Sequence, residues 1–336
     1  MKPVSIIIPC FNEQETISSL LQAIFDQTYS RRMMEVVIAD GMSTDSTRQR
    51  IAEFQSGHTG LDLQVVDNPR RIIPAALNCA IRASSGQILI RLDAHARPYP
   101  DYVERCVKAL ESDLGENVGG VWEIRPRRKG WLAEAIAAAA ADPLAVGDAY
   151  YRHTDRAGYV DTVPFFAIRR DLLARVGTFD ENLWTNEDYE FNVRISKADG
   201  RIWLDPAIRS IYYAQPGLNG LARQYGRYGY WKWHMLRKYP GTIRWRQALP
   251  PLFVFSLVFS CLMGFFFPFF WYLLAAELVI YCTFLVLDGI LHACSRKRAA
   301  MVIGLPLAIA VMHFAWGSGF LAGMLSGRRN QATLLL

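Results

Sequence analysis

An aspartate and a histidine stand two residues apart where an apolar stretch of the chain ends. Residues 88–92 read Ile-Leu-Ile-Arg-Leu and are followed by Asp93, Ala94 and His95. In an extended segment residues i and i+2 point to the same side, so Asp93 and His95 can face one ligand together. A carboxylate with an imidazole suits Mn²⁺, whereas carboxylates alone favour Mg²⁺. The pair predicts a divalent metal site, and the alternative is a strand followed by a polar turn.

A second group of acidic side chains lies in residues 179–191, beside several aromatic residues. Its members are Glu181, Glu187, Asp188 and Glu190. An acidic first turn stabilised by the helix dipole would account for some of them. Glu187 and Asp188 precede a Phe-Asn-Val-Arg segment, and this order suggests a helix whose first turn faces the site.

Strands and helices alternate over the first hundred residues. This order would place such side chains at one edge of a sheet. Strands are expected at residues 4–9, 35–39 and 61–66, with a fourth ending at Asp93. The helices between them are expected to begin at three residues, Asn12, Ser43 and Pro74. This alternation predicts a parallel, doubly wound α/β sheet, in which ligands bind outside the carboxyl ends of the strands. Pro9, Asp40 and Asp93 each stand at such an end.

The first strand-to-helix turn argues against a dinucleotide-binding fold. It reads Pro-Cys-Phe-Asn-Glu over residues 9–13 and contains no glycine. A dinucleotide fold would need Gly-x-Gly-x-x-Gly there to admit the pyrophosphate to the helix start. A nucleotide would therefore be held through acids and a divalent ion.

The C-terminal third of the chain is basic and apolar. Residues 1–220 hold 25 Lys and Arg against 29 Asp and Glu, whereas residues 221–336 hold 12 against 2. Because these bases flank apolar stretches, they favour an anionic membrane surface, and nucleic acid is not expected as a partner. Residues 221–248 alternate aromatic and basic side chains, which is typical of an amphipathic helix at the membrane interface.

Long uncharged stretches in residues 249–336 predict a transmembrane region. A span needs about 20 apolar residues, so about three spans are expected, with two to four open. Residues 247–295 fit two spans with a turn near 264–268, and residues 299–327 fit one more. Glu277 and Asp288 are costly inside a bilayer and should face protein or the interface. Basic residues 296–298 predict a cytoplasmic loop.

Four motifs in order resemble the family 2 (GT-A fold) inverting glycosyltransferases over about residues 4–230. They begin with Ser-Ile-Ile-Ile-Pro-Cys-Phe-Asn-Glu at residues 5–13 and Ala-Asp-Gly at 39–41 with Ser-Thr-Asp at 43–45. Leu-Asp-Ala-His at 92–95 and Glu187-Asp188 complete the set. The resemblance is strongest to membrane-associated β-glucosyltransferases of the ExoA type, from succinoglycan and exopolysaccharide biosynthesis. It implies a GT-A catalytic domain, Rossmann-like with a mostly parallel sheet, in residues 1–220, followed by the α-helical membrane region.

The resemblance also assigns roles at the donor site. It implies that Asp93 and His95 hold Mg²⁺ or Mn²⁺ on the diphosphate of a UDP-sugar. His95 stands where the family more commonly has Asp. The residues expected to bind the nucleotide-sugar are Pro9, Phe11, Glu13, Asp40 and Asp93.

The same resemblance makes Asp188 the general base, with Glu187 and Asp180 as competitors for that role. Attack from the face opposite the leaving group inverts an α-linked donor to a β-linked product. Such a reaction needs one carboxylate to accept the acceptor's proton and no covalent nucleophile.

Gln224, Arg227 and Tyr228 resemble the Gln-x-x-Arg-Trp motif of membrane synthases such as cellulose synthase, with Tyr in place of Trp. The first two are three residues apart and would share one helix face. The resemblance assigns these three residues to the acceptor or the donor diphosphate.

The expected function is transfer of a sugar, with glucose favoured, from a UDP-sugar to a polyprenyl-diphosphate-linked saccharide. The expected location is the bacterial inner membrane, with the catalytic domain facing the cytoplasm. A homo-oligomer is compatible with these features. The alternatives are a processive polysaccharide synthase, a polyprenyl-phosphate glycosyltransferase and a non-catalytic membrane-anchored nucleotide-sugar-binding protein. The short tail argues against the first, and the intact Asp40, Asp93 and Asp188 argue against the last.

Overall fold

The chain divides into two compact units in the computed structural model, which describes residues 1–326. The first unit comprises Met1–Glu123 and Ala149–Tyr212. The second comprises residues 124–148 together with the chain from Tyr213 onward. The segment 124–148, expected within the glycosyltransferase domain, thus groups with the C-terminal helices.

One mixed sheet organises the first unit. Among residues 1–326 it contains nine strands, in the order β3-β2-β1-β4-β8-β6-β9-β5 with β7 paired to β9. The strands are β1 Val4–Cys10, β2 Met34–Asp40, β3 Asp62–Asp67, β4 Ile88–Arg91, β5 Arg97–Pro98, β6 Asn117–Pro126, β7 Gly158–Tyr159, β8 Ala167–Arg169 and β9 Ile202–Ala214.

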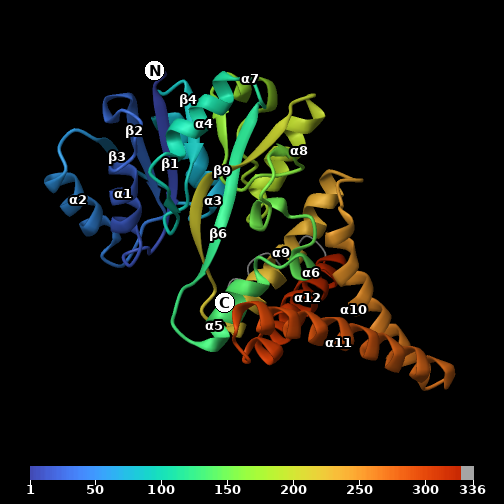
Figure 1. The fold of residues 1–336 in the computed structure, drawn as a ribbon. Coiled ribbons are helices and arrows are strands. Elements are labelled where there is room, and N and C mark those ends of the chain that lie inside the picture. Colours follow the sequence, from blue (N-terminus) through green and yellow to red (C-terminus); the bar gives the residue numbers. More distant parts are fainter. Residues whose placement is uncertain (327–336) are drawn as a thin grey trace. The chain divides into compact units, whose positions relative to one another are not determined.

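The helices of this unit lie on both faces of the sheet (Figure 1). Ile6 and Ile8 of β1 pack in one buried cluster with side chains of α1, α2 and α4, while Ile7 packs in another with α3 and α8. This division follows from the alternation of side chains along a strand. The helices are α1 Ile17–Phe25, α2 Thr47–Gly57, α3 Ile73–Ala83, α4 Tyr102–Glu111, α7 Leu172–Val176 and α8 Glu187–Lys197, with short 3-10 turns at Arg31–Met33 and Tyr150–Arg152.

The sheet is parallel in its N-terminal half and antiparallel beyond it. Strands β3, β2, β1 and β4 run parallel, as the alternating sequence pattern predicted. Strand β8 pairs antiparallel with both β4 and β6, and β5 and β7 pair antiparallel with β9. In this pairing Ala167 lies opposite Ile90 and Arg169 opposite Ile88, so the chain leaves β8 at the start of β4 and reaches α8 through α7.

Two predicted helix starts are wrong. Helix α1 begins at Ile17, five residues beyond the expected cap at Asn12, and α2 begins at Thr47 rather than at Ser43. Asn12 has a left-handed backbone (φ 54°) and hydrogen-bonds across to the next loop instead. Short polar side chains form such loop contacts as readily as helix caps, so spacing alone could not separate the two.

The second unit is helical. Its helices are α5 Trp131–Ala139, α6 Pro143–Val146, α9 Leu218–Lys238, α10 Trp245–Gly264, α11 Phe269–Arg296 and α12 Met301–Leu325. Alanines of α5 share a buried cluster with apolar side chains of α9, α11 and α12. This packing explains why residues 124–148 belong to the second unit, since the Ala-rich face of α5 lets those helices approach closely.

Three helices in the described part of the chain are long and apolar enough to cross a membrane, namely α10, α11 and α12. They coincide with the stretches predicted as spans, and the turn between the first two falls at residues 265–268. Most of the apolar side chains of α11 are exposed on the protein surface, and an apolar surface of this size is typical of an interaction site. Arg328 and Arg329, the next basic residues after this stretch, lie outside the described residues.

Helix α9, predicted to lie at the membrane interface, packs lengthwise on α12. Small residues permit this approach: a Cβ added at Gly319 would lie 2.1 Å from the carbonyl oxygen of Gly226. Tyr225 and Trp231 of α9 are buried in the unit. Close helix pairing through glycine is typical of membrane helices. Helix α9 therefore carries the aromatic and basic side chains and is also packed into the helical unit.

Candidate active site

Hydrogen bonds join the loops that follow β1 and β2. The N–H of Asn12 donates to Ser43 Oγ (2.9 Å), and the N–H of Thr44 donates to Asn12 Oδ1 (2.8 Å). The N–H of Glu13 donates to Thr47 Oγ1 (2.8 Å). The two loops are therefore fixed against each other at the carboxyl edge of the sheet, where ligands bind in folds of this class.

Asp40 anchors the second of these loops. Its side chain is fully buried and accepts hydrogen bonds from the N–H of Ser43 (3.0 Å) and from Nε of Arg48 (2.6 Å). Arg48 also pairs with Asp67 at the end of β3. In this structure Asp40 holds the loop in shape, and direct contact of its carboxylate with a nucleoside stays a prediction.

Phe11 lies in the loop that follows β1, and Pro9 is a residue of β1 itself. Phe11 is 45% exposed, and the guanidinium carbon of Arg71 lies 6.0 Å from the centre of its ring. Gly41 packs against the Phe11 ring, since an added Cβ would come within 3.2 Å of it. An exposed aromatic ring beside a cation gives a flat surface on which a nucleobase could stack.

Arg91 links the end of β4 to the start of α8. This side chain is buried, with Nε 3.0 Å from Asp93 Oδ1 and Nη2 2.9 Å from Glu187 Oε1. Burial opposes the guanidinium charge, but the carboxylates of Asp93 and Glu187 keep the pKa of Arg91 above its ordinary value. Arg91 thereby brings together two acids that are far apart in the sequence.

Asp188 occupies the first turn of α8, next to this ion pair. It is half-buried, whereas Glu187 is 5% exposed and pairs with Arg91. Burial raises the pKa of Asp188, the neighbouring charge of Glu187 raises it further, and Arg91 opposes both. A carboxylate with a raised pKa accepts a proton more readily, which favours Asp188 over Glu187 as a general base.

The other acids of the 179–191 segment have structural partners. Glu190 is fully buried and forms a two-pronged ion pair with Arg194, at 2.8 and 2.9 Å. Glu181 pairs with Arg70 and accepts a hydrogen bond from Asn78 Nδ2 (2.8 Å). Glu181 and Glu190 thus pair with arginines other than Arg91.

His95 is oriented by Glu13. Its Nδ1 lies 3.0 Å from Glu13 Oε1, and the second oxygen of Glu13 accepts a hydrogen bond from Thr16 (2.6 Å). A carboxylate on one ring nitrogen commonly directs the other nitrogen towards a metal. Nε of Arg91 bonds Oδ1 of Asp93, and in the described part of the chain the other oxygen, Oδ2, is placed to act as a metal ligand. The side chains present therefore fit a divalent ion at Asp93 and His95.

Comparison with known proteins identifies the family. The family model described as glycosyl transferase family 2 matches residues 5–177, just over half of the chain. The chain belongs to glycosyl transferase family 2.

Two relatives of this glycosyltransferase align along almost its entire length. It is 30% identical to the succinoglycan biosynthesis protein ExoA of Rhizobium meliloti, with 97% of this chain and 96% of that protein covered. It is 27% identical to the dolichyl N-acetyl-alpha-D-glucosaminyl phosphate 3-beta-D-2,3-diacetamido-2,3-dideoxy-beta-D-glucuronosyltransferase of Methanococcus voltae, with 97% and 98% covered. The predicted resemblance to the family and to the exopolysaccharide enzymes is thus confirmed.

Two solved structures share the fold. The mannosyltransferase PcManGT from Pyrobaculum calidifontis, in complex with GDP-Man and Mn²⁺, superposes with a TM-score of 0.58 at 23% identity, covering 93% of this chain and 87% of that one. The S. aureus TarS fragment 1–349 in complex with UDP-GlcNAc gives 0.51 at 14% identity, covering 96% and 92%. The GT-A fold is confirmed, with a curled mixed sheet and C-terminal apolar helices.

Arg91 is the site residue of this glycosyltransferase that the sequence reasoning missed. The signal was present, because an arginine within the apolar run 88–92 must find an acid when the strand is buried. What the sequence did not indicate is which acids it meets.

An aromatic group beside His95 was also missed. The rings of Trp122 and Tyr212 stack at 4.3 Å with an interplanar angle of 4°, and Tyr212 lies 6.4 Å from His95. The guanidinium carbon of Arg152 lies 5.1 Å from the centre of the Trp122 ring. Aromatic side chains commonly line ligand sites, and these come from β6, β9 and the 3-10 turn at Tyr150–Arg152.

Gln224, Arg227 and Tyr228 lie on α9, in the second unit. Gln224 Nε2 donates a hydrogen bond to the hydroxyl of Tyr228 (2.9 Å), which fixes both side chains along one face of the helix. Their role towards the acceptor or the donor diphosphate stays a prediction.

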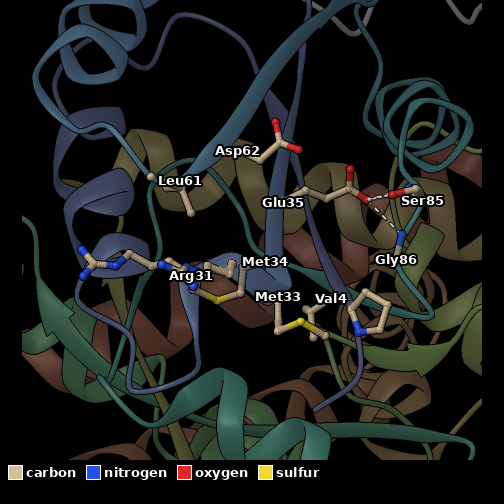
Figure 2. A pocket seen from close by; sticks show the side chains of 12 residues that line it. Val4, Arg31, Met33, Met34, Glu35, Leu61, Asp62, Ser85 and Gly86 are labelled. Carbon is tan, nitrogen blue, oxygen red and sulfur yellow. Dashed lines mark hydrogen bonds between the residues drawn. The ribbon is translucent and has the colours of Figure 1, made fainter.

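A separate hollow of about 420 Å³ lies at the opposite, amino edge of the sheet (Figure 2). Residues at the starts of β1, β2 and β3 line it, among them Val4, Met34 and Asp62. Figure 2 shows Glu35 pointing to Ser85 and Gly86, whose N–H groups donate to its carboxylate at 2.6 and 2.9 Å. This acid ties the strand starts together, and none of the predicted site residues is among the residues that line the hollow.

Replacing Arg91 by methionine should destabilise the protein markedly. The change leaves Asp93 and Glu187 without their buried partner, at a cost of about 3–5 kcal/mol in unfolding free energy. At roughly 2–4 °C per kcal/mol, the melting temperature of the purified chain should fall by roughly 6–20 °C.

The matched control for that experiment is Arg105→Met. Arg105 pairs with Asp101 one turn away, but its side chain is 44% exposed, so the pair should contribute about 0.5 kcal/mol or less. Thermal unfolding followed by tryptophan fluorescence compares the two variants. Equal melting temperatures would show that the Arg91 ion pairs do not hold the site together.

Proposed function

We propose that this glycosyltransferase is membrane-anchored and inverting, and that it transfers glucose from UDP-glucose in β-linkage to a polyprenyl-diphosphate-linked saccharide of exopolysaccharide biosynthesis. The catalytic part of this proposal rests on the arrangement of side chains at the start of α8. There Asp188 has a raised pKa, next to Arg91 and its two carboxylate partners.

Each residue of this site has one task in the proposed reaction. Asp188 accepts the proton of the acceptor hydroxyl as that oxygen attacks the anomeric carbon from the face opposite the diphosphate. The bond from the anomeric carbon to the diphosphate oxygen breaks, and the α-linked donor becomes a β-linked product. A divalent ion held by Asp93 and His95 would neutralise the leaving diphosphate. Glu187 and Arg91 hold Asp188 and Asp93 in place.

A lipid-linked acceptor is supported by the second unit and by one relative. Helices α10, α11 and α12 are long and apolar enough to cross a membrane. The name of the Methanococcus voltae relative specifies a dolichyl-phosphate-linked sugar as its substrate. An enzyme whose acceptor is confined to the bilayer gains from being held at the same surface, because the encounter becomes two-dimensional.

The charges of the helical unit support a cytoplasmic catalytic face. Arg237, Lys238, Arg244 and Arg246 precede or begin α10, and Arg296, Lys297 and Arg298 follow α11. If α10 crosses outward and α11 returns, both basic groups lie on the cytoplasmic side, as the positive-inside rule requires. The location that follows is a bacterial inner membrane.

The proposal is tested by supplying membranes that contain the enzyme with labelled nucleotide sugars and extracted lipid-linked saccharides. UDP-glucose should label material that partitions into organic solvent and that mild acid releases as a saccharide. Membranes carrying Asp188→Asn serve as the control and should give little label. Transfer from only another nucleotide sugar would refute the glucose assignment, and a water-soluble polymer would indicate a processive synthase.

A further inference from the structure

Three metal-ligating side chains meet in the second unit, in a cluster that the glycosyltransferase reaction does not use. They are Asp142, on the turn between α5 and α6, and Asp288 and His292 of α11. One ligand atom from each can be chosen so that all three lie within 4.8 Å of one another. His292 Nε2 is 2.9 Å from Asp142 Oδ2 and 4.0 Å from Asp288 Oδ1.

Local structure aims these three side chains at one point. Asp288 and His292 are four residues apart on α11, so they project from the same face. Asp142 caps α6, and its Oδ1 accepts the N–H of Leu144 at 2.7 Å. That bond fixes the carboxylate and leaves Oδ2 directed at His292.

Two atoms of the cluster are buried without a hydrogen-bond partner among the described residues. They are Oδ2 of Asp288 and Nδ1 of His292. A buried polar atom left unpaired is costly, and in a native protein such an atom calls for an explanation, such as an ion or a bound water. An ion in the cluster would satisfy Oδ2 of Asp288, whereas Nδ1 of His292 lies on the other side of the ring from Nε2, the nitrogen that faces the two carboxylates.

The charge of the cluster points to a cation. Asp142 is 3% exposed, and Asp288 lies within a helix apolar enough to span a membrane. Two carboxylates in such surroundings are expensive, and a protonated His292 would offset only one of them. A divalent cation with a neutral imidazole leaves no net charge on the group.

We propose that Asp142, Asp288 and His292 form a second divalent-cation site, separate from the one at Asp93 and His95, that takes a first-row transition ion such as Zn²⁺. Two carboxylate oxygens and one imidazole nitrogen give the three protein ligands of an open zinc site, with water completing the shell. The imidazole selects against Mg²⁺ and Ca²⁺, which prefer oxygen alone. The ion would tie the α5–α6 turn to α11.

Zinc binding is measured on the full-length protein in detergent, in an Asp93→Asn/His95→Gln background that removes the ligands of the other site. After chelator treatment, the protein is dialysed against Zn²⁺ in excess Mg²⁺, and bound zinc is counted by atomic emission. We expect about one ion per chain with this three-ligand site. Adding His292→Gln or Asp288→Asn should weaken zinc binding more than roughly tenfold. Loss of a residue that only supports a ligand already costs at least about tenfold in metal affinity, and these two residues would be ligands themselves.

The matched control is Glu277→Gln, which changes an acid of the same helix that bonds Ser256 outside the cluster. It should leave zinc binding unchanged. Zinc should also raise the melting temperature of the background protein but not that of its His292→Gln derivative. If the background protein binds no zinc, or if His292→Gln binds it as tightly, the cluster is a plain histidine–carboxylate contact and the proposal is wrong.

Discussion

Replacing Asp188 by asparagine should lower turnover roughly 10²–10⁴-fold, the range typical of a lost general base. The substitution nearly preserves shape but removes the charge that accepts the acceptor's proton. Donor binding is expected to depend on Asp40, Asp93 and the metal, so affinity for the UDP-sugar should survive. Donor affinity and single-turnover transfer are measured on the same membrane preparation, so that a binding defect is not mistaken for a chemical one.

The matched variant is Glu187→Gln, one residue away in the same helical turn. Glu187 contacts Arg91 at 2.9 Å and is buried, so its loss should reduce stability more than the chemical step. If Asp188→Asn turns over normally while Glu187→Gln is inactive, Glu187 is the base. If both bind donor and turn over like the parent, the acids at the start of α8 are structural.

Removing divalent metal should abolish transfer, and adding Mn²⁺ should restore it. Charge neutralisation on a leaving diphosphate contributes several kcal/mol, so the loss should be at least roughly 10³-fold. His95→Ala should raise the Mn²⁺ concentration needed for activity and should weaken Mn²⁺ binding followed by electron paramagnetic resonance. Membrane insertion should not change.

His58→Gln is the control for the histidine, because His58 stacks on Phe54 in the sheet-covering helix layer and touches none of the predicted ligands. The Asp288→Asn variant distinguishes the two proposed cation sites. Its transfer activity should still depend on Mn²⁺, because Asp288 belongs to the second site. Full activity in the presence of a chelator would refute the metal assignment at Asp93 and His95.

The sequence alone determined the parallel half of the sheet and the edge at which the site lies. Apolar β-branched runs alternating with helices define that half locally, and each run ends in a residue that could bind or react, such as Asp40 or Asp93. The apolar stretches of the C-terminal third likewise predicted the three long helices, because length and hydropathy are local properties.

Only the tertiary structure decided which acids act together. Glu187 and Asp93 both reach Arg91 because the chain leaves β8 opposite Ile88, at the start of β4, and comes back through α7 to the start of α8. No local pattern encodes that long-range path. For the same reason Asn12 and Ser43 could be mistaken for helix caps, since their partners lie about thirty residues away in the opposite loop. The contact between Asp142 and His292 likewise depends on the packing of α5 among the C-terminal helices. Small apolar residues permit this packing, but their sequence does not determine which helices meet.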